Sequence, residues 1–275
     1  MKDVGCIKRL EIAKIVSIGA YLKKDDSLVL LPVRYLSSTL KEGDFVDVFL
    51  YTDSEDRLIA TTLNPLALLG EIAALRIVDK NNYGCFLDLG IAKDIFMPTK
   101  SSEPYKVGSY VVVFIDKDKE GRLIARHNIK SYLKNIKDSS LKVFCKVSIL
   151  PFKRTNLGYE CVINGKYLGL VYHNEVFIKD FLFNKQVGYI KRIYKDGKCD
   201  LSLKPPMEKS KSQAERVFMI LKSNGGVMKF GYDSSPQEIL EVFEMSKKSF
   251  KKSLSDLITE HKIEVFDNCY IRILY

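Results

Sequence analysis

The sequence has no long apolar run, because apolar residues nowhere approach the roughly 18 consecutive positions that a membrane-spanning helix needs. Its first residues, MKDVGCIKRLEIAK, are charged and contain no apolar signal core, so we expect no secretion signal. Together these two absences predict a cytoplasmic protein that does not act in a membrane.

Cysteine pairs and histidine clusters are also absent. None of the six cysteines lies in a C-x-x-C pair, and the three histidines are far apart with no ligand spacing. Most of the cysteines fall in apolar, strand-like segments, which indicates buried free thiols in a reducing compartment. We therefore expect no disulfide, no metal and no cofactor.

Catalytic signatures are missing as well. The sequence contains no phosphate-binding loop of the Walker type, no G-x-S-x-G, no paired-carboxylate motif and no metal-spaced His/Cys cluster. Asp116, Asp118 and Glu120 do lie close together, but in a segment typical of a surface turn, where acidic residues are common. The sequence predicts a protein that is not an enzyme.

Positive charge is concentrated in one part of the chain. The formal net charge is +10, and residues 131–206, with 14 basic and 6 acidic side chains, supply +8 of it. Such an excess indicates a polyanionic partner, either nucleic acid or an anionic membrane. A solvated basic surface that serves only solubility is an equally open interpretation of the charge alone.

An internal repeat divides the chain. GDFVDVFLYTDSEDRLIA (43–60) aligns without gaps on GSYVVVFIDKDKEGRLIA (108–125) at an offset of 65, and the same offset pairs Gly19 with Gly84. One offset that holds from both ends of a segment indicates duplicated domains. Each unit has about five short strands in roughly 60 residues, which fits a small closed barrel. A third, more diverged copy runs from about 140 to 204.

The last segment changes to a helical period. SQAERVFMILKS, SSPQEILEVF and MSKKSFKKSLSDLITEHK predict three helices, the second and third capped by Ser235 and Ser246. IEVFDNCYIRIL predicts a hairpin that turns at DN. Three helices followed by a two-stranded ribbon is the order of a winged-helix domain. The predicted fold is mainly β with a C-terminal α+β domain: barrels over 1–63, 68–130 and 140–205, then a winged helix over 209–275.

The motif YGCFLDLG (83–90), followed by IFMP and the turn DKDKEGR, resembles the S1-type OB-fold, an RNA-binding module. LGLVYHNEV (168–176) and LSLKP (201–205) resemble the same pattern in the third repeat. Three such domains before a winged helix that contains MSKKSFKKSL are similar to the bacterial conserved virulence factor B family over nearly the whole chain. The resemblance implies an RNA-binding protein that affects gene expression.

In S1-type domains an aromatic ring on the solvent face is a platform for unpaired bases, each stack being worth about 1–3 kcal/mol. The resemblance implies that Tyr83 and Phe86 form this platform in the second repeat, with Arg122 contacting the RNA backbone or a base edge. Met97 falls where the family has a histidine, which implies that this contact is lost. Alternatively, a neighbouring domain covers Phe86, and Arg122 is only a solvated turn residue.

The other two repeats depart from the pattern. The first has Tyr21 at one platform position, Ile18 at the other and Arg57 in the turn, so we interpret it as a weak or structural copy. The third has Glu160 where the second ring is expected, unless a one-residue bulge turns Tyr159 outward. At and beside the histidine position it has Tyr172 and His173, which are candidates for RNA contact but could equally fill and cap the barrel. The remaining candidates are the cations of the last hairpin: Lys191, Arg192, Lys195 and Lys198.

Four lysines lie on one face of the last predicted helix, as on a recognition helix: Lys247, Lys248, Lys251 and Lys252. An ordinary exposed face is the other interpretation, since residues 207–275 carry a net charge of only +1. The leading hypothesis is a non-catalytic regulator that binds single-stranded RNA. The alternatives are a transcription regulator that binds duplex DNA through the winged helix, and a scaffold on the ribosome or a ribonuclease, with protein partners left open.

Overall fold

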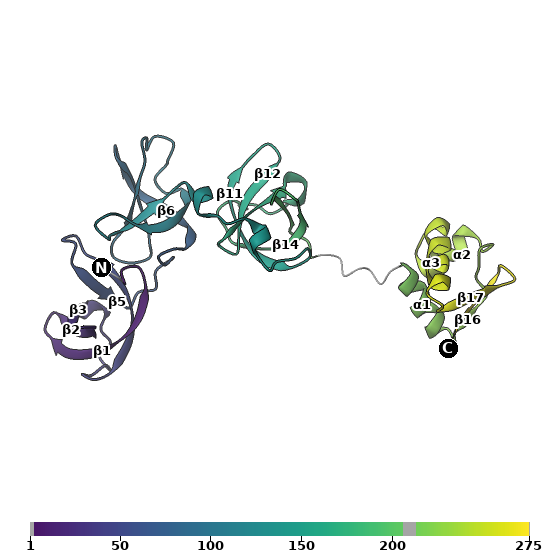
Figure 1. The fold of residues 1–275 in the computed structure, drawn as a ribbon, viewed down its shortest axis with the longest axis horizontal. Coiled ribbons are helices and arrows are strands. Elements are labelled where there is room, and N and C mark those ends of the chain that lie inside the picture. Colours follow the sequence, from purple (N-terminus) through teal and green to yellow (C-terminus); the bar gives the residue numbers. More distant parts are fainter. Residues whose placement is uncertain (1–2, 206–212, 275) are drawn as a thin grey trace. The chain divides into compact units, whose positions relative to one another are not determined.

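The computed structural model describes residues 3–205 and 213–274 and divides the chain into two compact units, one ending at Lys204 and one beginning at Pro205. The first unit contains three closed five-stranded barrels, and the second is a winged-helix domain with three helices and three short strands (Figure 1). The predicted fold class is confirmed.

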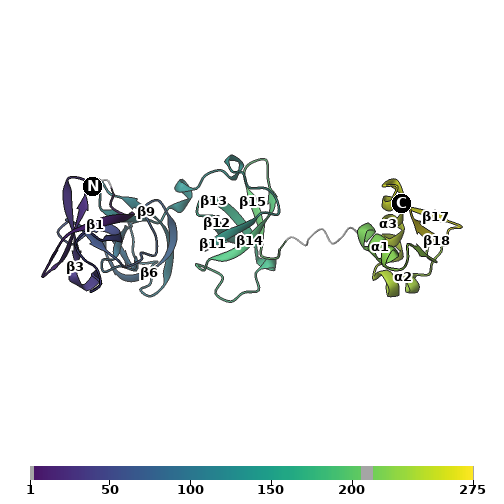
Figure 2. The same cartoon turned by 90° about the horizontal axis from the view of Figure 1, so that it is seen from below.

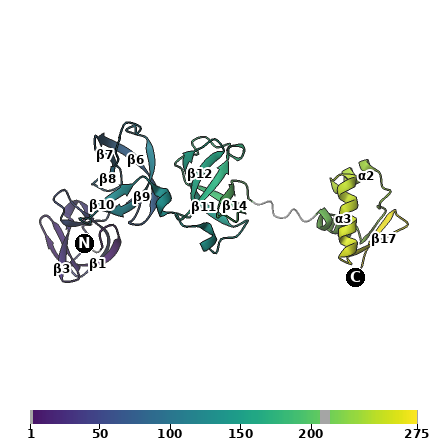
Figure 3. The same cartoon turned by 45° about the horizontal axis from the view of Figure 1, so that its top comes forward.

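All three barrels have the same strand order: first, second, third, fifth, fourth. Barrel 1 consists of β1 (Ile7–Val16), β2 (Gly19–Lys24), β3 (Ser27–Pro32), β4 (Phe45–Thr52) and β5 (Leu58–Thr61). Barrel 2, whose strands are labelled in Figure 3, consists of β6 (Ile72–Asn81), β7 (Gly84–Leu87), β8 (Ile95–Pro98), β9 (Tyr110–Lys117) and β10 (Leu123–Arg126). Barrel 3 consists of β11 (Lys146–Arg154), β12 (Gly158–Ile163), β13 (Tyr167–Tyr172), β14 (Gln186–Ile193) and β15 (Cys199–Ser202).

The long first strand of each barrel pairs with both the second and the fourth strand, and closes the sheet. Its register shifts at the same place in each repeat: after Ile12 in β1, after Ile77 in β6 and after Pro151 in β11. A bulge bends and twists a strand locally, which lets one strand serve both sides of a small barrel. The duplicated sequence therefore folds with duplicated irregularities.

Three glycines at equivalent positions allow the second and third strands of each barrel to approach closely. A Cβ atom added to Gly19, Gly84 or Gly158 would lie 2.0, 2.2 or 2.1 Å from a carbonyl oxygen of the facing strand. Each of these glycines pairs with the residue that ends the third strand. No side chain fits there without moving the two strands apart.

Neighbouring barrels share buried surface. Phe49 and Tyr51 of β4 lie in the same apolar cluster as Leu75 and Leu87 of barrel 2. A second cluster joins barrels 2 and 3 through residues that include Ile129. The segment between these barrels contains two 3₁₀ turns, Ile129–Tyr132 and Ile136–Asp138, which bury Ile129 and Ile136. Two further 3₁₀ turns, Val33–Tyr35 and His173–Glu175, follow the third strands of barrels 1 and 3.

The winged-helix domain has the elements that the sequence predicts. Its elements are α1 (Gln213–Ser223), β16 (Val227–Met228), α2 (Pro236–Phe243), α3 (Lys247–Thr259), β17 (Ile263–Phe266) and β18 (Tyr270–Ile273). Figure 2 shows the three helices beside the hairpin β17–β18. Ser235 and Ser246 accept the capping hydrogen bonds of α2 and α3. The hairpin turns at Asp267 and Asn268, both with positive φ, which matches a type I′ turn. The two-residue strand β16 was missed in the sequence.

Among the residues described, no helix is long and apolar enough to cross a membrane.

Candidate nucleic-acid interface

One row of side chains crosses the outer face of each barrel at the same register, and we call it the outer row. In barrel 2 it runs from β6 through β7, β8 and β10 to β9, over Asp79, Phe86, Phe96, Ile124 and Asp116. None of these residues is buried. The outer row of barrel 2 therefore has an apolar, aromatic centre with a carboxylate at each end.

Two rings at the centre of this row pack against each other. Phe86 and Phe96 are half-buried, and their centroids are 5.2 Å apart with the planes inclined by 46°. Tyr83, just before β7, is 79% exposed. Phe96 was missed as a candidate, although the alternation in IFMP (95–98) places it on the outer face. Met97 is fully buried, and the residue opposite Gly84 is Pro98, so the loss of the histidine contact stays a prediction.

Barrel 1 covers part of this face. A cleft of about 370 Å³ is lined by Phe86, Phe96 and Arg122 of barrel 2 and by Tyr51 and Asp56 of barrel 1. Barrel 1 therefore lies next to Phe86, as the alternative interpretation expects, but the ring still lines an open cleft.

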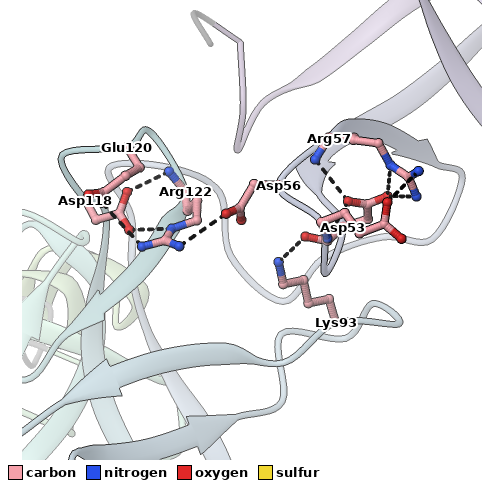
Figure 4. A network of polar contacts seen from close by, with 8 residues as sticks. Asp53, Asp56, Arg57, Lys93, Asp118, Glu120 and Arg122 are labelled. Atoms are coloured by element: carbon pink, nitrogen blue, oxygen red, sulfur yellow. Dashed lines mark hydrogen bonds and ion pairs between the residues drawn. The ribbon is translucent and has the colours of Figure 1, made fainter.

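Carboxylates surround the turn arginine of barrel 2 (Figure 4). Arg122 Nε donates to Asp118 at 2.7 Å, and its two terminal nitrogens donate to Asp56 and Glu120 at 3.3 Å each. Burial by itself raises the pKa of Asp118, but the hydrogen bonds from Arg122 outweigh it and hold that pKa below its ordinary value. Arg122 is therefore engaged, and a phosphate would compete with three carboxylates for it.

The turn arginine of barrel 1 is engaged in the same way. Arg57 donates to Asp53 through Nε at 2.9 Å and through a terminal nitrogen at 2.7 Å, and it also pairs with Glu55. A lysine of barrel 2, Lys93, donates to the Asp53 carbonyl at 2.6 Å. Arg57 is thus paired within its own turn, and this turn is bonded to barrel 2.

The outer row of barrel 1 has little accessible aromatic surface. It consists of Lys14, Tyr21, Leu30, Ile59 and Tyr51. Tyr51 is only 4% exposed, because it packs against barrel 2, and Tyr21 is half-buried. Ile18 is exposed, as expected for a diverged platform position.

Barrel 3 reverses the charge pattern of barrel 2. Its outer row consists of Lys153, Glu160, Leu170, Asp200 and Arg192. The bulge lies in β11 and not in β12, so the ring of Tyr159 stays inside, 5.1 Å from that of Phe181. Glu160 therefore occupies the platform position, and a cation stands at each end of the row.

A tyrosine replaces the turn aspartate in barrel 3. The Tyr194 amide donates to the Lys198 carbonyl, just as Asp53 and Asp118 donate to Arg57 and Arg122. Tyr194 lies under the Arg192 guanidinium, 4.7 Å from it, and its hydroxyl donates to Asp200 at 2.7 Å. Lys198 occupies the arginine position and, among the residues described, pairs only with the exposed Asp196, at 2.8 Å. Tyr194 was missed, although aligning YKDGK (194–198) with DKEGR (118–122) places it opposite Asp118.

These side chains open onto a cleft of about 900 Å³, the barrel 3 cleft. Its lining combines tyrosine rings and carboxylates with exposed cations, and includes Tyr172, Tyr194, Glu160, Asp200, Lys153, Arg154 and Lys198. Tyr172 also donates to Asp200, at 3.4 Å. Rings and cations in one open cleft suit a strand that presents both bases and phosphates.

Other candidates of barrel 3 lie outside this cleft. His173 donates through Nε2 to the Thr155 carbonyl at 2.8 Å and packs edge-on against Tyr159, so it fastens the end of the barrel. Lys191 pairs with Glu175 at 2.6 Å. Lys195 is exposed, and its backbone carbonyl accepts a hydrogen bond from Lys137.

In the winged-helix domain, Lys248, Lys251 and Lys252 are exposed on α3, and Lys247 is partly buried. The wing has an aromatic pair that was missed in the sequence: Phe266 and Tyr270 stack at 5.2 Å, with the Arg272 guanidinium 5.6 Å from the Phe266 ring.

The cysteines are free thiols, and Cys85, Cys161 and Cys199 are buried. Burial raises the pKa of both Cys161 and Cys199 to about 12. The described residues contain no group of three or more His, Cys, Asp or Glu side chains that could hold a metal ion.

Comparison with protein families adds independent information. The model of the S1 domain matches residues 4–63 and 69–126, and that of the CvfB-like winged helix domain matches residues 215–271. The chain belongs to the conserved virulence factor B family. The two S1 matches fall on barrels 1 and 2, and barrel 3 shares their strand order and register.

Relatives align over most of this conserved virulence factor B-like chain. "Uncharacterized protein YitL" of Bacillus subtilis is 25% identical over 268 residues, which cover 92% of this chain and 88% of the relative. "Conserved virulence factor B" of Staphylococcus aureus (strain USA300) is 24% identical over 279 residues, which cover 95% and 91%. A crystal structure of a multidomain protein with nucleic acid binding domains from Streptococcus pneumoniae is 22% identical, covers 100% of this chain and 99% of its own, and has a TM-score of 0.44.

Proposed function

We propose that the protein is a non-catalytic, cytoplasmic RNA-binding protein that binds single-stranded RNA and regulates gene expression after transcription. The observation that carries this proposal is the barrel 3 cleft, where Tyr172 and Tyr194 lie beside Lys153, Arg154 and Lys198. Rings stack on bases of any sequence, and cations neutralise phosphates, so a cleft with both binds single strands. S1 domains in the same chain support the proposal.

The barrels would divide this work. Barrel 2 presents the rings of Tyr83, Phe86 and Phe96, but carboxylates end its outer row and its turn arginine is engaged. Barrel 3 lies in the segment that supplies +8 of the net charge. We infer that barrel 3 makes most of the phosphate contacts and that barrel 2 adds stacking.

The direct test is a titration of labelled single-stranded RNA with the full-length chain, followed by competition with unlabelled RNA or duplex DNA. RNA should displace the label at lower concentrations than duplex DNA of equal length. An absence of RNA binding would contradict the proposal. Crosslinking to cellular RNA, with the crosslinked peptides identified, would show which of the proposed surfaces touch it.

Replacing Phe86 by alanine should weaken RNA binding by about the worth of one stack, 1–3 kcal/mol, which is roughly 5- to 150-fold. The barrel should remain folded, because the ring is only half-buried and its main partner is Phe96. Fluorescence anisotropy measures the affinity, and a thermal melt checks the fold. Tyr110→Ala is the matched control, since Tyr110 is a 50% exposed ring of barrel 2 outside the outer row. A melting temperature that collapses would show that Phe86 is a core residue.

Replacing Asp56 by asparagine should strengthen RNA binding a few-fold. The change removes one of the three carboxylates that hold Arg122, and an exposed ion pair of this kind is worth about 0.2–1 kcal/mol. Glu55→Gln is the control, because Glu55 loses the same charge one residue away but pairs with Arg57. Equal gains in both variants would mean that only the net charge matters, and no gain in either would leave Arg122 without a role in binding.

A second candidate function, duplex DNA binding, has an observation of its own. The exposed lysines of α3 and the stacked pair Phe266 and Tyr270 on the wing are the surfaces that winged-helix proteins turn toward a duplex. Duplex DNA that displaces the label at lower concentrations than RNA would favour this function. Binding of neither nucleic acid would favour a protein-docking scaffold.

A further inference from the structure

Two carboxylates stand in the middle of the cationic face of barrel 3. Glu160 and Asp200 flank Leu170 in the outer row, and the row ends in Lys153 and Arg192. The positions of these carboxylates hold only uncharged side chains in the other barrels: Tyr21 and Ile59 in barrel 1, Phe86 and Ile124 in barrel 2. Negative charge at the centre of the face is thus particular to barrel 3.

The two carboxylates differ in how well they are bonded. Asp200 is 9% exposed and accepts hydrogen bonds from the hydroxyls of Tyr194 and Tyr172. Glu160 has a side chain that is 19% exposed, and its Oε1 accepts from Lys130 at 2.6 Å. Its Oε2 receives no hydrogen bond from any residue that the structure describes. A carboxylate oxygen without a donor inside a protein is unfavourable. Oε2 is buried in the described position, so Glu160 gains by turning toward the cleft that it lines when a ligand there brings a donor.

The charge pattern fixes how a strand lies in the barrel 3 cleft. Phosphates are repelled from the two carboxylates and attracted to the cations of the rim, such as Arg154 and Lys198. A base is then left to enter between Glu160 and Asp200, with Leu170 as an apolar surface under its ring. In this orientation the edge of the base, and not the backbone, meets Glu160.

An ionised carboxylate only accepts hydrogen bonds. Cytosine offers it an amino group at position 4, whereas uracil carries a carbonyl oxygen there, which a carboxylate repels. The donor that uracil has on this edge, N3–H, lies between two carbonyl oxygens, so a carboxylate that approaches it meets their repulsion. In an unpaired strand this edge of the base is free to be read. We propose that Glu160 makes barrel 3 selective for bases that carry an exocyclic amino group, and that it discriminates against uracil. The selectivity rests on the RNA binding proposed above and adds base choice to the same cleft.

The experiment compares two probes that differ mainly at position 4 of the base: labelled single strands of ten cytidines and of ten uridines. Anisotropy titrations with the full-length chain should give about tenfold tighter binding of the cytidine strand. Glu160→Gln should bring the ratio of the two affinities close to one, chiefly by strengthening uridine binding, because the glutamine amide also donates. Thermal melts of each variant check that it is folded.

Glu175→Gln is the matched control. Glu175 also pairs with a lysine of barrel 3, Lys191, at 2.6 Å and is similarly shielded, but it does not line the cleft. Its replacement should leave the ratio unchanged. Equal binding of both probes by the unmodified chain would overturn the base selection while RNA binding stands. A tenfold ratio that survives Glu160→Gln would remove Glu160 from the inference, and binding of neither probe would overturn the proposed function itself.

Discussion

Charge reversal of three exposed cations of barrel 3, Arg154, Lys195 and Lys198, should lower the affinity of the full chain for single-stranded RNA about 100-fold at near-physiological salt. Each phosphate contact on a single strand contributes about −0.7 to the slope of log affinity against log salt, so the slope should flatten by about 2. The loss should be the same for every RNA sequence, because phosphate contacts position a strand without reading it.

The control for this triple variant keeps the change in net charge and moves it to barrel 2. Lys100, Lys106 and Lys119 are exposed there and, among the described residues, make no ion pair. Their replacement by glutamate should weaken binding only a few-fold. If both triple variants lose affinity and slope equally, the basic surface of barrel 3 acts through overall charge, as a solubility feature would. Lys191 is left out of the triple because its partner Glu175 is shielded from water, so reversing Lys191 would set two carboxylates face to face there. The partner of Lys198, Asp196, is exposed, so water screens that repulsion.

Replacing Gly84 by alanine should cost barrel 2 about 3–5 kcal/mol of stability, enough to unfold it in part at ambient temperature. The new Cβ would lie 2.2 Å from the Met97 carbonyl oxygen and 2.8 Å from the Phe96 ring, so β7 and β8 would have to separate. Separation exposes the core beneath and disrupts the aromatic platform. Urea unfolding followed by circular dichroism measures the loss.

Gly108→Ala is the control that separates steric overlap of the new Cβ from backbone strain. Gly108 has φ +85°, and nothing lies within 4 Å of an added Cβ, so the change carries only the cost of a left-handed backbone, about 1–2 kcal/mol. A loss at Gly84 no larger than that at Gly108 would mean that β7 and β8 can adjust, and that the close approach of the strands is not required.

Much of the fold could be predicted from the sequence because the repeat constrains it twice. A single offset pairs Gly19 with Gly84, and the structure gives both the same close approach to the third strand. The caps Ser235 and Ser246 are local signals, so the bounds of α2 and α3 were also readable. A helix or strand can be predicted where signals close to it in the sequence, such as a capping residue, determine its structure.

Contacts between domains were not predictable in this way. The second half of β4 is buried on both faces, because one face packs on the core of barrel 1 and the other on barrel 2. The alternation of apolar and polar residues along the strand does not show that Tyr51 packs against barrel 2. The pairing of Asp56 with Arg122 joins residues in different repeats. The contacts that Tyr194 makes with Arg192 and Asp200 were likewise not readable, although its alignment with Asp118 was.

The buried free thiols of this chain can serve as probes of which barrel unfolds. Cys85 is buried in barrel 2, and Cys161 and Cys199 are buried in barrel 3, so an alkylating reagent reaches each of them only when its own barrel unfolds. A chain of several domains does not melt as one unit, and a single melting temperature averages over them. Pulsed alkylation followed by mass spectrometry would instead give separate opening free energies for barrels 2 and 3. The same thiols would show whether bound RNA slows the opening of barrel 3 while barrel 2 keeps its own rate.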